Sequence, residues 1–371
     1  MFPKSALKNL LFSFTVIFFV FFIAEVASVV VYTLSKKKAG VKNGAPTSEE
    51  AYFINHPTLG WYPSPGYDGF RQGRYRMDKE RMYKVKVNSV GMRDREISNE
   101  KPKNTIRILC IGDSITEGPG VNNEATYPKL LENILNEKAP NKKYEVFNCG
   151  VGDYNTAQEV LFLRDIGLTY KPDVVILGYY LNDGRKFVPD ETINLKMPGL
   201  NLLKKSRFVY YLNKIILKYR IKFQWKAWNK GRDRWVPFYA KKTWQHNRVA
   251  LYNLIKLADR DWGVAWTERG WKEIDKNLYL LVALRDKYNF KLIVLNFPDV
   301  IQIYSDFTDD YLYYPQNCLR KYCLKRNIPY IDLIPFIKNY PMDYLFIDHC
   351  HYTPEGLNEV AKIVSKEFFK K

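Results

Sequence analysis

The chain has 371 residues, of which 46% are hydrophobic and 16% aromatic, so it can form a sizeable core and is not globally disordered. Its 20 glycines and 19 prolines are ordinary numbers for this length, which excludes collagenous and low-complexity proteins. The formal net charge of +19 indicates anionic surroundings, namely lipid headgroups, nucleic acid or an acidic polymer.

Residues 10–34 form a mostly apolar run that Glu25 interrupts past its middle. About 20 apolar residues suffice to span a bilayer, so this run predicts an N-terminal transmembrane helix. A cleavable signal peptide that ends near Ala27 is the alternative. The apolar residues Val29–Tyr32 continue beyond that point and favour an uncleaved anchor. Lysines flank the run on both sides, so the charge distribution does not decide its orientation.

The segment after this run is predicted to be a linker followed by a small accessory β segment. Residues 36–50 are rich in Lys, Gly, Ser and Pro, and apolar and polar residues then alternate in Tyr83–Val90, which predicts a strand. The predicted division of the chain is a membrane anchor or signal segment at 1–35, the linker and β segment at 36–103, and the main domain at 104–371.

Short apolar runs alternate with helix-like stretches from Ile106 onward. The predicted strands are Ile106–Ile111, Tyr144–Asn148, Asp173–Leu177, Lys291–Asn296 and Pro329–Leu333. The predicted helices are Tyr127–Asn136, Ala157–Gly167, about 271–288, about 309–326 and Pro354–Phe369. This alternation predicts an α/β domain with a parallel sheet and helices on both faces. Ligands of such sheets bind at the carboxyl ends of the strands.

Residues 201–250 differ from the rest of the domain in composition. They contain fourteen Lys or Arg residues, one acidic residue and four tryptophans. We predict a basic aromatic helical insertion at about 190–270. Its composition fits docking on lipid headgroups, binding of an anionic polymer such as a glycan, or a merely solvated helical face. Nucleic acid also fits the composition, but not an exported protein, and is not predicted as a partner.

The five cysteines are scattered and include no C-x-x-C pair, which argues against a zinc ribbon or a dense disulfide framework. A single bridge between Cys318 and Cys323 is one alternative. Burial as small apolar side chains is the expectation for Cys110 and Cys149.

Gly112-Asp113-Ser114 directly follows the first predicted strand of the main domain. A serine at this position can act as a nucleophile at the edge of the sheet, where backbone N–H groups can meet an oxyanion. A helix N-cap is the alternative role for Ser114.

The loop before the last predicted helix contains Asp348 and His351. A carboxylate three residues before an imidazole can orient it, and the imidazole can then deprotonate a serine hydroxyl. A metal site made by these two residues with His349 and Cys350 would require neighbours on one tight loop to converge. We therefore predict no metal and no cofactor.

Together these motifs resemble the SGNH/GDSL hydrolase family of serine esterases and acylhydrolases. Four blocks occur in the order of the family across residues 106–371. They are Gly112-Asp113-Ser114, the second block Asn148–Gln158, the third block Gly178–Asp183 and the last block Asp348-x-x-His351. The resemblance implies a flavodoxin-like, three-layer α/β/α fold with a parallel central sheet.

The resemblance also implies a role for each matching residue. Ser114 would attack an ester carbonyl, with His351 as its base and Asp348 orienting the imidazole. The oxyanion would be held by the Ser114 backbone N–H, the Asn182 side chain and a backbone N–H of the second block. The usual glycine of that block aligns with Asp153, so either Gly152 or Asp153 supplies this third donor. A carboxylate is unfavourable beside a developing oxyanion.

The predicted function is that of a membrane-anchored, extracytoplasmic serine esterase. It would hydrolyse an acyl ester, preferably an O-acetyl group, on a cell-envelope glycan through an acyl-serine intermediate. The alternatives are a lipid esterase or thioesterase, an O-acyltransferase, and a weakly active assembly protein that binds glycan or membrane. The expected partners are a carbohydrate or lipid ester, the membrane through residues 10–34, and an anionic polymer or headgroups at 201–250.

Overall fold

The computed structural model describes residues 12–13, 15–16, 18–30, 52–56, 58–72, 82–139, 141–187, 208, 219 and 230–368. The chain forms two compact units. The first unit combines Met1–Ala45 with Asp190–Trp225, and the second combines Pro46–Pro189 with Lys226–Lys371.

The first unit contains a helix at residues 18–30, which is part of the predicted anchor. The Glu25 carboxylate accepts a hydrogen bond from the Phe208 backbone N–H at 2.9 Å, so this charged side chain is not isolated. The rings of Phe21 and Phe208 meet edge to face, with centroids 5.5 Å apart. Among the described residues, no helix combines the length and the apolar content needed to cross a bilayer. The predicted linker at 36–50 lies outside the described residues.

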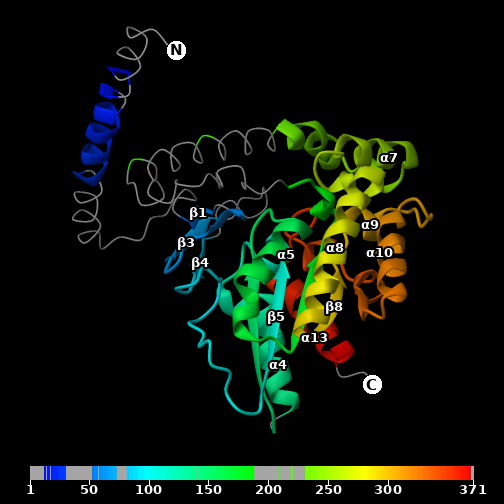
Figure 1. Cartoon of the computed structure of the whole chain (residues 1–371). Helices are drawn as coiled ribbons and strands as arrows, with labels where there is room; N and C mark the ends of the chain where they lie inside the picture. Colours follow the sequence, from blue (N-terminus) through cyan, green and yellow to red (C-terminus); the bar gives the residue numbers. More distant parts are fainter. Residues whose placement is uncertain are drawn as a thin grey trace. The chain divides into compact units, whose positions relative to one another are not determined.

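A five-stranded sheet of parallel strands lies at the centre of the second unit (Figure 1), as the sequence predicted. Its strand order is β6-β5-β7-β8-β9. The strands are β5 (Thr105–Gly112), β6 (Lys143–Gly150), β7 (Val174–Tyr179), β8 (Lys291–Asn296) and β9 (Tyr330–Asp332). Every residue of β7 is buried, which is why this strand is a continuous apolar run rather than an alternating one.

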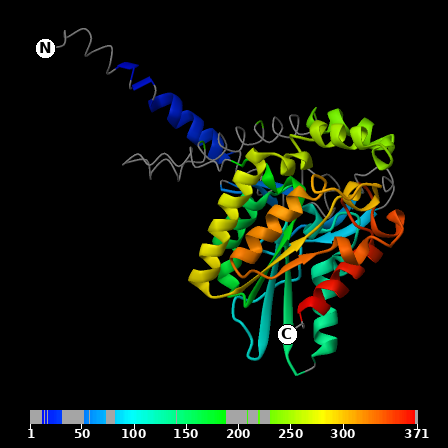
Figure 2. The same cartoon turned by 90° about the vertical axis from the view of Figure 1, so that its right-hand side faces the viewer.

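Helices cover both faces of this sheet (Figure 2), and successive residues of β5 contact different layers. Ile108 and Cys110 belong to the core cluster formed with α4 (Tyr127–Lys138) and α13 (Pro354–Phe368). Leu109 and Ile111 belong to the opposite cluster, formed with α5 (Thr156–Asp165), α8 (Glu268–Tyr288) and α10 (Tyr314–Lys325). The predicted helices are therefore present, although α10 begins five residues later than the expected residue 309.

Two short antiparallel pairs precede the central sheet. β1 (Phe53–His56) pairs with β2 (Gly60–Pro63), and β3 (Asp68–Gln72) pairs with β4 (Met82–Lys86). The predicted strand Tyr83–Val90 is shorter in the structure, because β4 ends at Lys86 and not at Val90. The Asn88 side chain accepts hydrogen bonds from the backbone N–H groups of Val90 and Met92, which turns the chain after β4.

The cysteines of the structure are all free, so the alternative of a Cys318–Cys323 bridge is wrong. Both residues lie on α10, five positions apart. This spacing corresponds to a rise of about 7.5 Å along a helix, which is beyond the reach of a disulfide. Cys110 and Cys149 are buried, as expected.

The described part of the predicted insertion is helical and contributes to the core. Residues 230–240 form a helix, and η6 (Thr243–Gln245), α7 (Arg248–Leu257) and η7 (Trp262–Trp266) follow. Trp235 and Trp244 are each only 1% exposed, so these two tryptophans are not available for docking on a membrane surface. Most of 190–229 lies outside the described residues.

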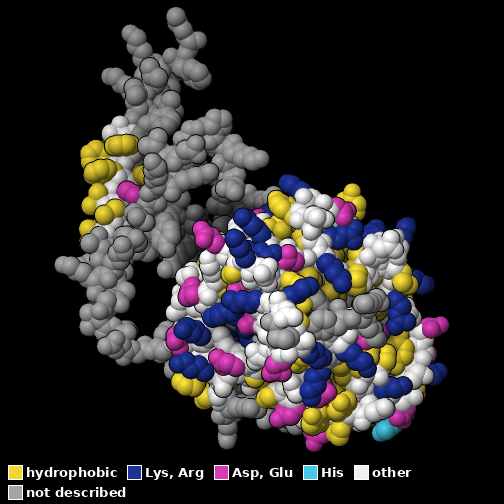
Figure 3. All heavy atoms as spheres, turned by 90° about the horizontal axis from the view of Figure 1, so that it is seen from below, with side chains coloured by type: hydrophobic (Ala, Val, Ile, Leu, Met, Phe, Trp, Pro, Cys, Tyr) yellow, Lys and Arg dark blue, Asp and Glu magenta, His cyan; other side chains and the backbone are white. Residues whose placement is uncertain are grey.

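Basic and acidic side chains are interspersed on the face of the molecule shown in Figure 3.

Candidate active site

Ser114 is the first residue after the turn that follows β5, and it begins the short helix α3 (Ser114–Glu117). The N-cap of this helix is Asp113, whose Oδ1 accepts a hydrogen bond from the Ile115 N–H at 2.9 Å. The alternative role of Ser114 as an N-cap is therefore wrong, and its hydroxyl is free for another partner. Gly112 is required before the turn, because an added Cβ would lie 2.1 Å from Thr116 Oγ1.

The loop before α13 brings His351 and Asp348 to this serine. His351 Nε2 lies 2.8 Å from Ser114 Oγ, and His351 Nδ1 lies 2.8 Å from Asp348 Oδ2. The other carboxylate oxygen of Asp348 accepts the backbone N–H groups of Cys350 at 2.9 Å and of His351 at 2.8 Å. With Nδ1–H donating to the carboxylate, Nε2 is left as the acceptor that faces the serine hydroxyl.

The surroundings of Asp348 favour its ionised form. Burial alone would raise the pKa of Asp348, but its charge interactions with His351 and His349 and the hydrogen bonds from His351 together bring it well below the usual value. Burial lowers the pKa of His349 to about 3, so this second imidazole is neutral at pH 7. Asp348 can therefore stabilise a positive charge on His351 when His351 accepts a proton.

Asn182 lies beside the nucleophile turn and contacts it directly. Its Nδ2 donates to Asp113 Oδ2 at 3.1 Å, and its side chain is 6% exposed. Asp113 thus accepts one hydrogen bond from each side, from Ile115 and from Asn182. Burial raises the pKa of Asp113 to about 6, against the opposing effect of the Ile115 N–H. The hydrogen bond to Asp113 fixes which end of the Asn182 amide is the NH₂ group.

Asp153 adopts the backbone conformation that the glycine of this block would take. Its φ is +66°, in the left-handed region. The carboxylate of Asp153 is paired with Arg185, whose Nη1 lies 2.6 Å from Asp153 Oδ1, and Arg185 Nη2 donates to the Asp153 carbonyl at 2.9 Å. The unfavourable effect expected from a carboxylate beside an oxyanion is therefore offset by a guanidinium. Arg185 was not predicted as a site residue from the sequence, although it lies only two residues after the third block.

In the part of the chain that the structure describes, three backbone N–H groups of the nucleophile turn and the second block have no hydrogen-bond acceptor. They are the N–H groups of Ser114, Gly152 and Asp153. The structure thus brings Ser114, Asn182 and the second block together at the carboxyl ends of β5, β6 and β7, which are neighbours in the sheet.

The same loop contains the atoms of a potential metal site. Single ligand atoms of Asp348, Cys350 and His351 lie within 4.8 Å of one another. However, both ring nitrogens of His351 already contact other groups, Asp348 on one side and Ser114 on the other. Burial also raises the pKa of the Cys350 thiol well above its usual value, which opposes formation of a thiolate ligand. The arrangement fits proton transfer better than metal binding.

The helix at residues 230–240 packs directly against the loop before α13 that contains Asp348 and His351, which we call the acid–base loop. The Trp235 and His349 rings have centroids 4.9 Å apart, and those of Tyr239 and His349 are 5.9 Å apart. The Trp235 indole N–H donates to Asp261 at 3.2 Å, which holds the ring in place. The described part of the insertion therefore supports the loop that contains His351, a role that composition did not indicate.

The accessory β segment supports the other side of the site. Arg71 in β3 forms an ion pair with Glu117, the last residue of α3, with Nη1 2.8 Å from Oε1. Arg93 is fully buried and donates to the carbonyl oxygens of Glu117, Gly118 and Val121. The helix that begins with Ser114 is thus fixed at its end by two arginines from upstream segments.

We expect Arg71→Met to lower the free energy of unfolding by about 3 kcal/mol, because it leaves a buried carboxylate without its cation. The side chains of Arg71 and Glu117 are only 6% and 2% exposed. Urea denaturation measures this loss. The double variant Arg71→Met/Glu117→Gln removes both charges and should recover most of the stability. A loss below about 1 kcal/mol in the single variant would show that the pair behaves like an exposed one.

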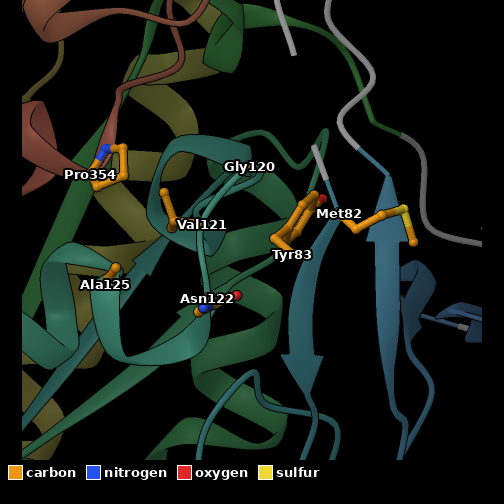
Figure 4. Close-up of a pocket in the computed structure, with 7 residues that line it drawn as sticks. All are labelled: Met82, Tyr83, Gly120, Val121, Asn122, Ala125 and Pro354. Carbon is orange, nitrogen blue, oxygen red and sulfur yellow. The ribbon is translucent and has the colours of Figure 1, made fainter. Parts of the chain in front are cut away.

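A pocket of about 380 Å³ lies beside these segments (Figure 4). Tyr83 of β4, Val121 of the loop after α3 and Pro354 at the start of α13 contribute to its lining. Pro354 is three residues from His351 in the sequence, but neither His351 nor Ser114 lines the pocket. We therefore assign it no role in the chemistry.

Residues 110–251 match the GDSL-like Lipase/Acylhydrolase family. An acetylxylan esterase from Xylanibacter ruminicola is 36% identical over 93 residues, which are 22% of this chain and 18% of that protein. The chain thus matches about a fifth of the length of this curated relative. These two similarities support the prediction of an enzyme that hydrolyses ester bonds.

Several solved structures are also similar to this chain. An acetyl xylan esterase is 17% identical, with a TM-score of 0.38, and the match covers 70% of this chain and 98% of that one. An acetyl-xylooligosaccharide esterase from Geobacillus Stearmophilus is 16% identical, with a TM-score of 0.41 and coverage of 72% and 95%. An α/β hydrolase from the metagenome of Lake Arreo is 15% identical, with a TM-score of 0.42 and coverage of 71% and 94%.

Proposed function

We propose that this protein is a serine esterase that removes an acyl group, preferably acetyl, from a cell-envelope glycan outside the cytoplasm. The observation that carries the proposal is the hydrogen-bonded series from Ser114 through His351 to Asp348, with 2.8 Å at each of the two contacts. A hydroxyl, an imidazole and a carboxylate in this order constitute the arrangement that activates a serine for attack on a carbonyl.

The first half of the reaction transfers the acyl group to the enzyme. Ser114 Oγ forms a bond to the acyl carbon while His351 Nε2 takes the hydroxyl proton, and the carbonyl oxygen becomes an oxyanion. The bond from the acyl carbon to the sugar oxygen then breaks, and His351 returns the proton to that oxygen. The products of this half are a free sugar hydroxyl and an ester on Ser114.

The second half removes the acyl group with water. His351 Nε2 takes a proton from a water molecule, whose oxygen forms a bond to the acyl carbon. When the bond to Ser114 Oγ breaks, His351 gives the proton back to the serine. A carboxylic acid leaves, and all three side chains regain their starting protonation states.

The oxyanion of both steps would be stabilised by donors that are already in place. We assign this role to the Ser114 N–H, to the Asn182 NH₂ group and to the Asp153 N–H. Donors fixed before the reaction need little reorganisation, which is why such groups contribute strongly to catalysis. The Asp113 carboxylate orients Asn182 for this task through their 3.1 Å hydrogen bond.

Two observations support the glycan substrate and the location. The acetylxylan esterase relative is named for an acetylated polysaccharide, which favours an O-acetyl glycan ester over a lipid ester here. The apolar run at residues 10–34 and the net charge of +19 favour attachment to a membrane, and the location outside the cytoplasm is proposed because a cell-envelope glycan lies there.

Covalent labelling of the full-length protein tests the serine esterase. A fluorophosphonate probe should label wild type, and peptide mapping should locate the label on Ser114. Hydrolysis of p-nitrophenyl acetate and release of acetate from an acetylated polysaccharide should accompany it. The variant Ser114→Ala should lose both the label and the turnover. Turnover that persists at the wild-type rate in Ser114→Ala would exclude this serine as the nucleophile.

A further inference from the structure

The peptide bond between Gly152 and Asp153 determines where the proposed third oxyanion donor points. The Gly152 carbonyl accepts a hydrogen bond from the Trp61 indole N–H at 2.9 Å. In a trans peptide the carbonyl and the following N–H point in opposite directions. The Asp153 N–H is therefore directed away from the Trp61 indole, and it has no acceptor among the described residues.

This peptide bond is the central one of a β-turn. The Tyr154 N–H donates to the Val151 carbonyl at 3.2 Å, which places Gly152 and Asp153 at the two central positions. The φ of Asp153 is +66°, whereas Gly152 is not among the residues with a positive φ. These are the features of a type II turn, whose third position normally requires glycine or asparagine.

An aspartate at this position favours a different turn. In a type I turn the third residue has a negative φ, and aspartate adopts this conformation without strain. The two turn types differ mainly by a flip of the central peptide. The flip would turn the Asp153 N–H toward the Trp61 indole and the Gly152 carbonyl oxygen away from it, to the side on which the oxyanion is proposed to form, where the carbonyl oxygen would repel it. Something must therefore hold the strained turn, and a hydrogen bond provides a stabilisation of the same order as the strain.

Trp61 is well placed to hold it. The residue belongs to β2, 91 positions before Gly152 in the sequence. The Tyr154 hydroxyl donates to the Trp61 carbonyl at 2.6 Å, and Gln158 Nε2 donates to the Leu59 carbonyl at 2.8 Å. These two bonds fix the strand against the second block, so the indole N–H remains aimed at the Gly152 carbonyl.

We propose that Trp61 is a positioning residue for the esterase reaction, because its indole N–H keeps the Gly152–Asp153 peptide in the orientation that presents the Asp153 N–H to the oxyanion. Arg185 restrains the next peptide in the same way, by donating to the Asp153 carbonyl at 2.9 Å. The inference rests on the proposed esterase function. It assigns to the accessory β segment a part in transition-state stabilisation.

The variant Trp61→Phe tests this directly, since it removes the N–H and keeps an aromatic ring. We expect kcat for p-nitrophenyl acetate to fall about 10- to 100-fold with little change in KM, because the donor acts on the oxyanion and not on the bound ester. The pH dependence of kcat should keep its shape, since Trp61 does not contact His351 or Asp348. A merely structural effect would instead lower the melting temperature and the active fraction found by fluorophosphonate titration.

Trp266→Phe is the matched control, because it also deletes an indole hydrogen bond to a backbone carbonyl, that of Tyr311 at 2.7 Å, but leaves the Gly152 carbonyl bonded. Its kcat should stay within about threefold of wild type. The more specific test combines Trp61→Phe with Asp153→Gly. Glycine adopts a positive φ without strain. The fold-decrease in kcat caused by Trp61→Phe should therefore be at least about tenfold smaller in the Asp153→Gly protein than in wild type.

The outcomes separate this inference from the function on which it rests. A wild-type protein that neither hydrolyses the ester nor reacts with the probe would overturn the proposed function. A wild-type enzyme that is active, with Trp61→Phe within about twofold of it in kcat, would overturn only the role of Trp61. An equal fold-decrease in kcat from Trp61→Phe with and without Asp153→Gly would also overturn the role of Trp61, since the indole would then not act by holding this turn.

Discussion

Replacing His351 with alanine is expected to lower kcat for ester hydrolysis by about 10⁶-fold, because serine and imidazole act as one unit. His351 Nε2 lies 2.8 Å from Ser114 Oγ, and no other histidine of the described residues contacts this hydroxyl. Without the imidazole, the hydroxyl proton has no acceptor during the attack, and the leaving sugar oxygen has no donor. Steady-state rates with p-nitrophenyl acetate measure the effect.

His246 offers a matched control for this variant. Its Nδ1 also contacts a carboxylate, Asp306 Oδ2 at 2.7 Å, but the pair is largely exposed and has no serine partner. His246→Ala should therefore leave kcat unchanged, whereas His351→Ala should also react at least about 10³-fold more slowly with a fluorophosphonate. Retention of more than about 1% of wild-type turnover by His351→Ala would rule out this residue as the general base.

The order of strands and helices was predictable because the sheet is buried on both faces. The run from Thr105 to Gly112 is apolar almost throughout, and β8 was predicted with its observed bounds, Lys291–Asn296. The ends of elements were less predictable where side chains decide them. The Asn88 side chain ends the strand region after β4, and no periodicity in the sequence marks that effect.

The proximity of Ser114 to the second and third blocks was predictable from topology, since parallel strands that end at one edge bring their loops together, whereas the placing of Asp348 and His351 beside Ser114 was implied by the family resemblance. The contacts that refine the site did not follow. Trp61 and Gly152 are 91 residues apart, and nothing in either local sequence links them. Asp153 could be recognised as a departure from glycine, but its positive φ and its ion pair with Arg185 depend on tertiary structure.

The burial of the tryptophans in the insertion was also not predictable from the sequence. Composition alone suggests a surface for lipid or polymer, because Trp and Lys or Arg occur together in 201–250. In the structure, Trp235 is 1% exposed and packs on His349, next to the acid–base loop. Whether a tryptophan points inward depends on what the rest of the fold offers it, and a composition window contains no such information.

Asp348→Asn is expected to lower kcat by about 10⁴-fold while leaving the fold intact. The reason lies in the two different partners of the carboxylate. Its Oδ1 accepts the N–H groups of Cys350 and His351, so in the variant the amide oxygen should keep this place. The NH₂ group then faces His351 Nδ1 and makes that nitrogen an acceptor. Nε2 consequently carries the proton and can no longer accept one from Ser114.

Stability measurements distinguish this tautomer effect from damage to the loop. The pKa of Asp348 is lower in the folded protein than in the unfolded chain, so its ionised form stabilises wild type above about pH 4, and this stabilisation is lost as the pH falls further. Asp348→Asn should lack this pH dependence. Asp348→Ala should lose more stability, because two loop N–H groups lose their acceptor. Turnover of Asp348→Asn within about tenfold of wild type would mean that the carboxylate does not set the tautomer of His351.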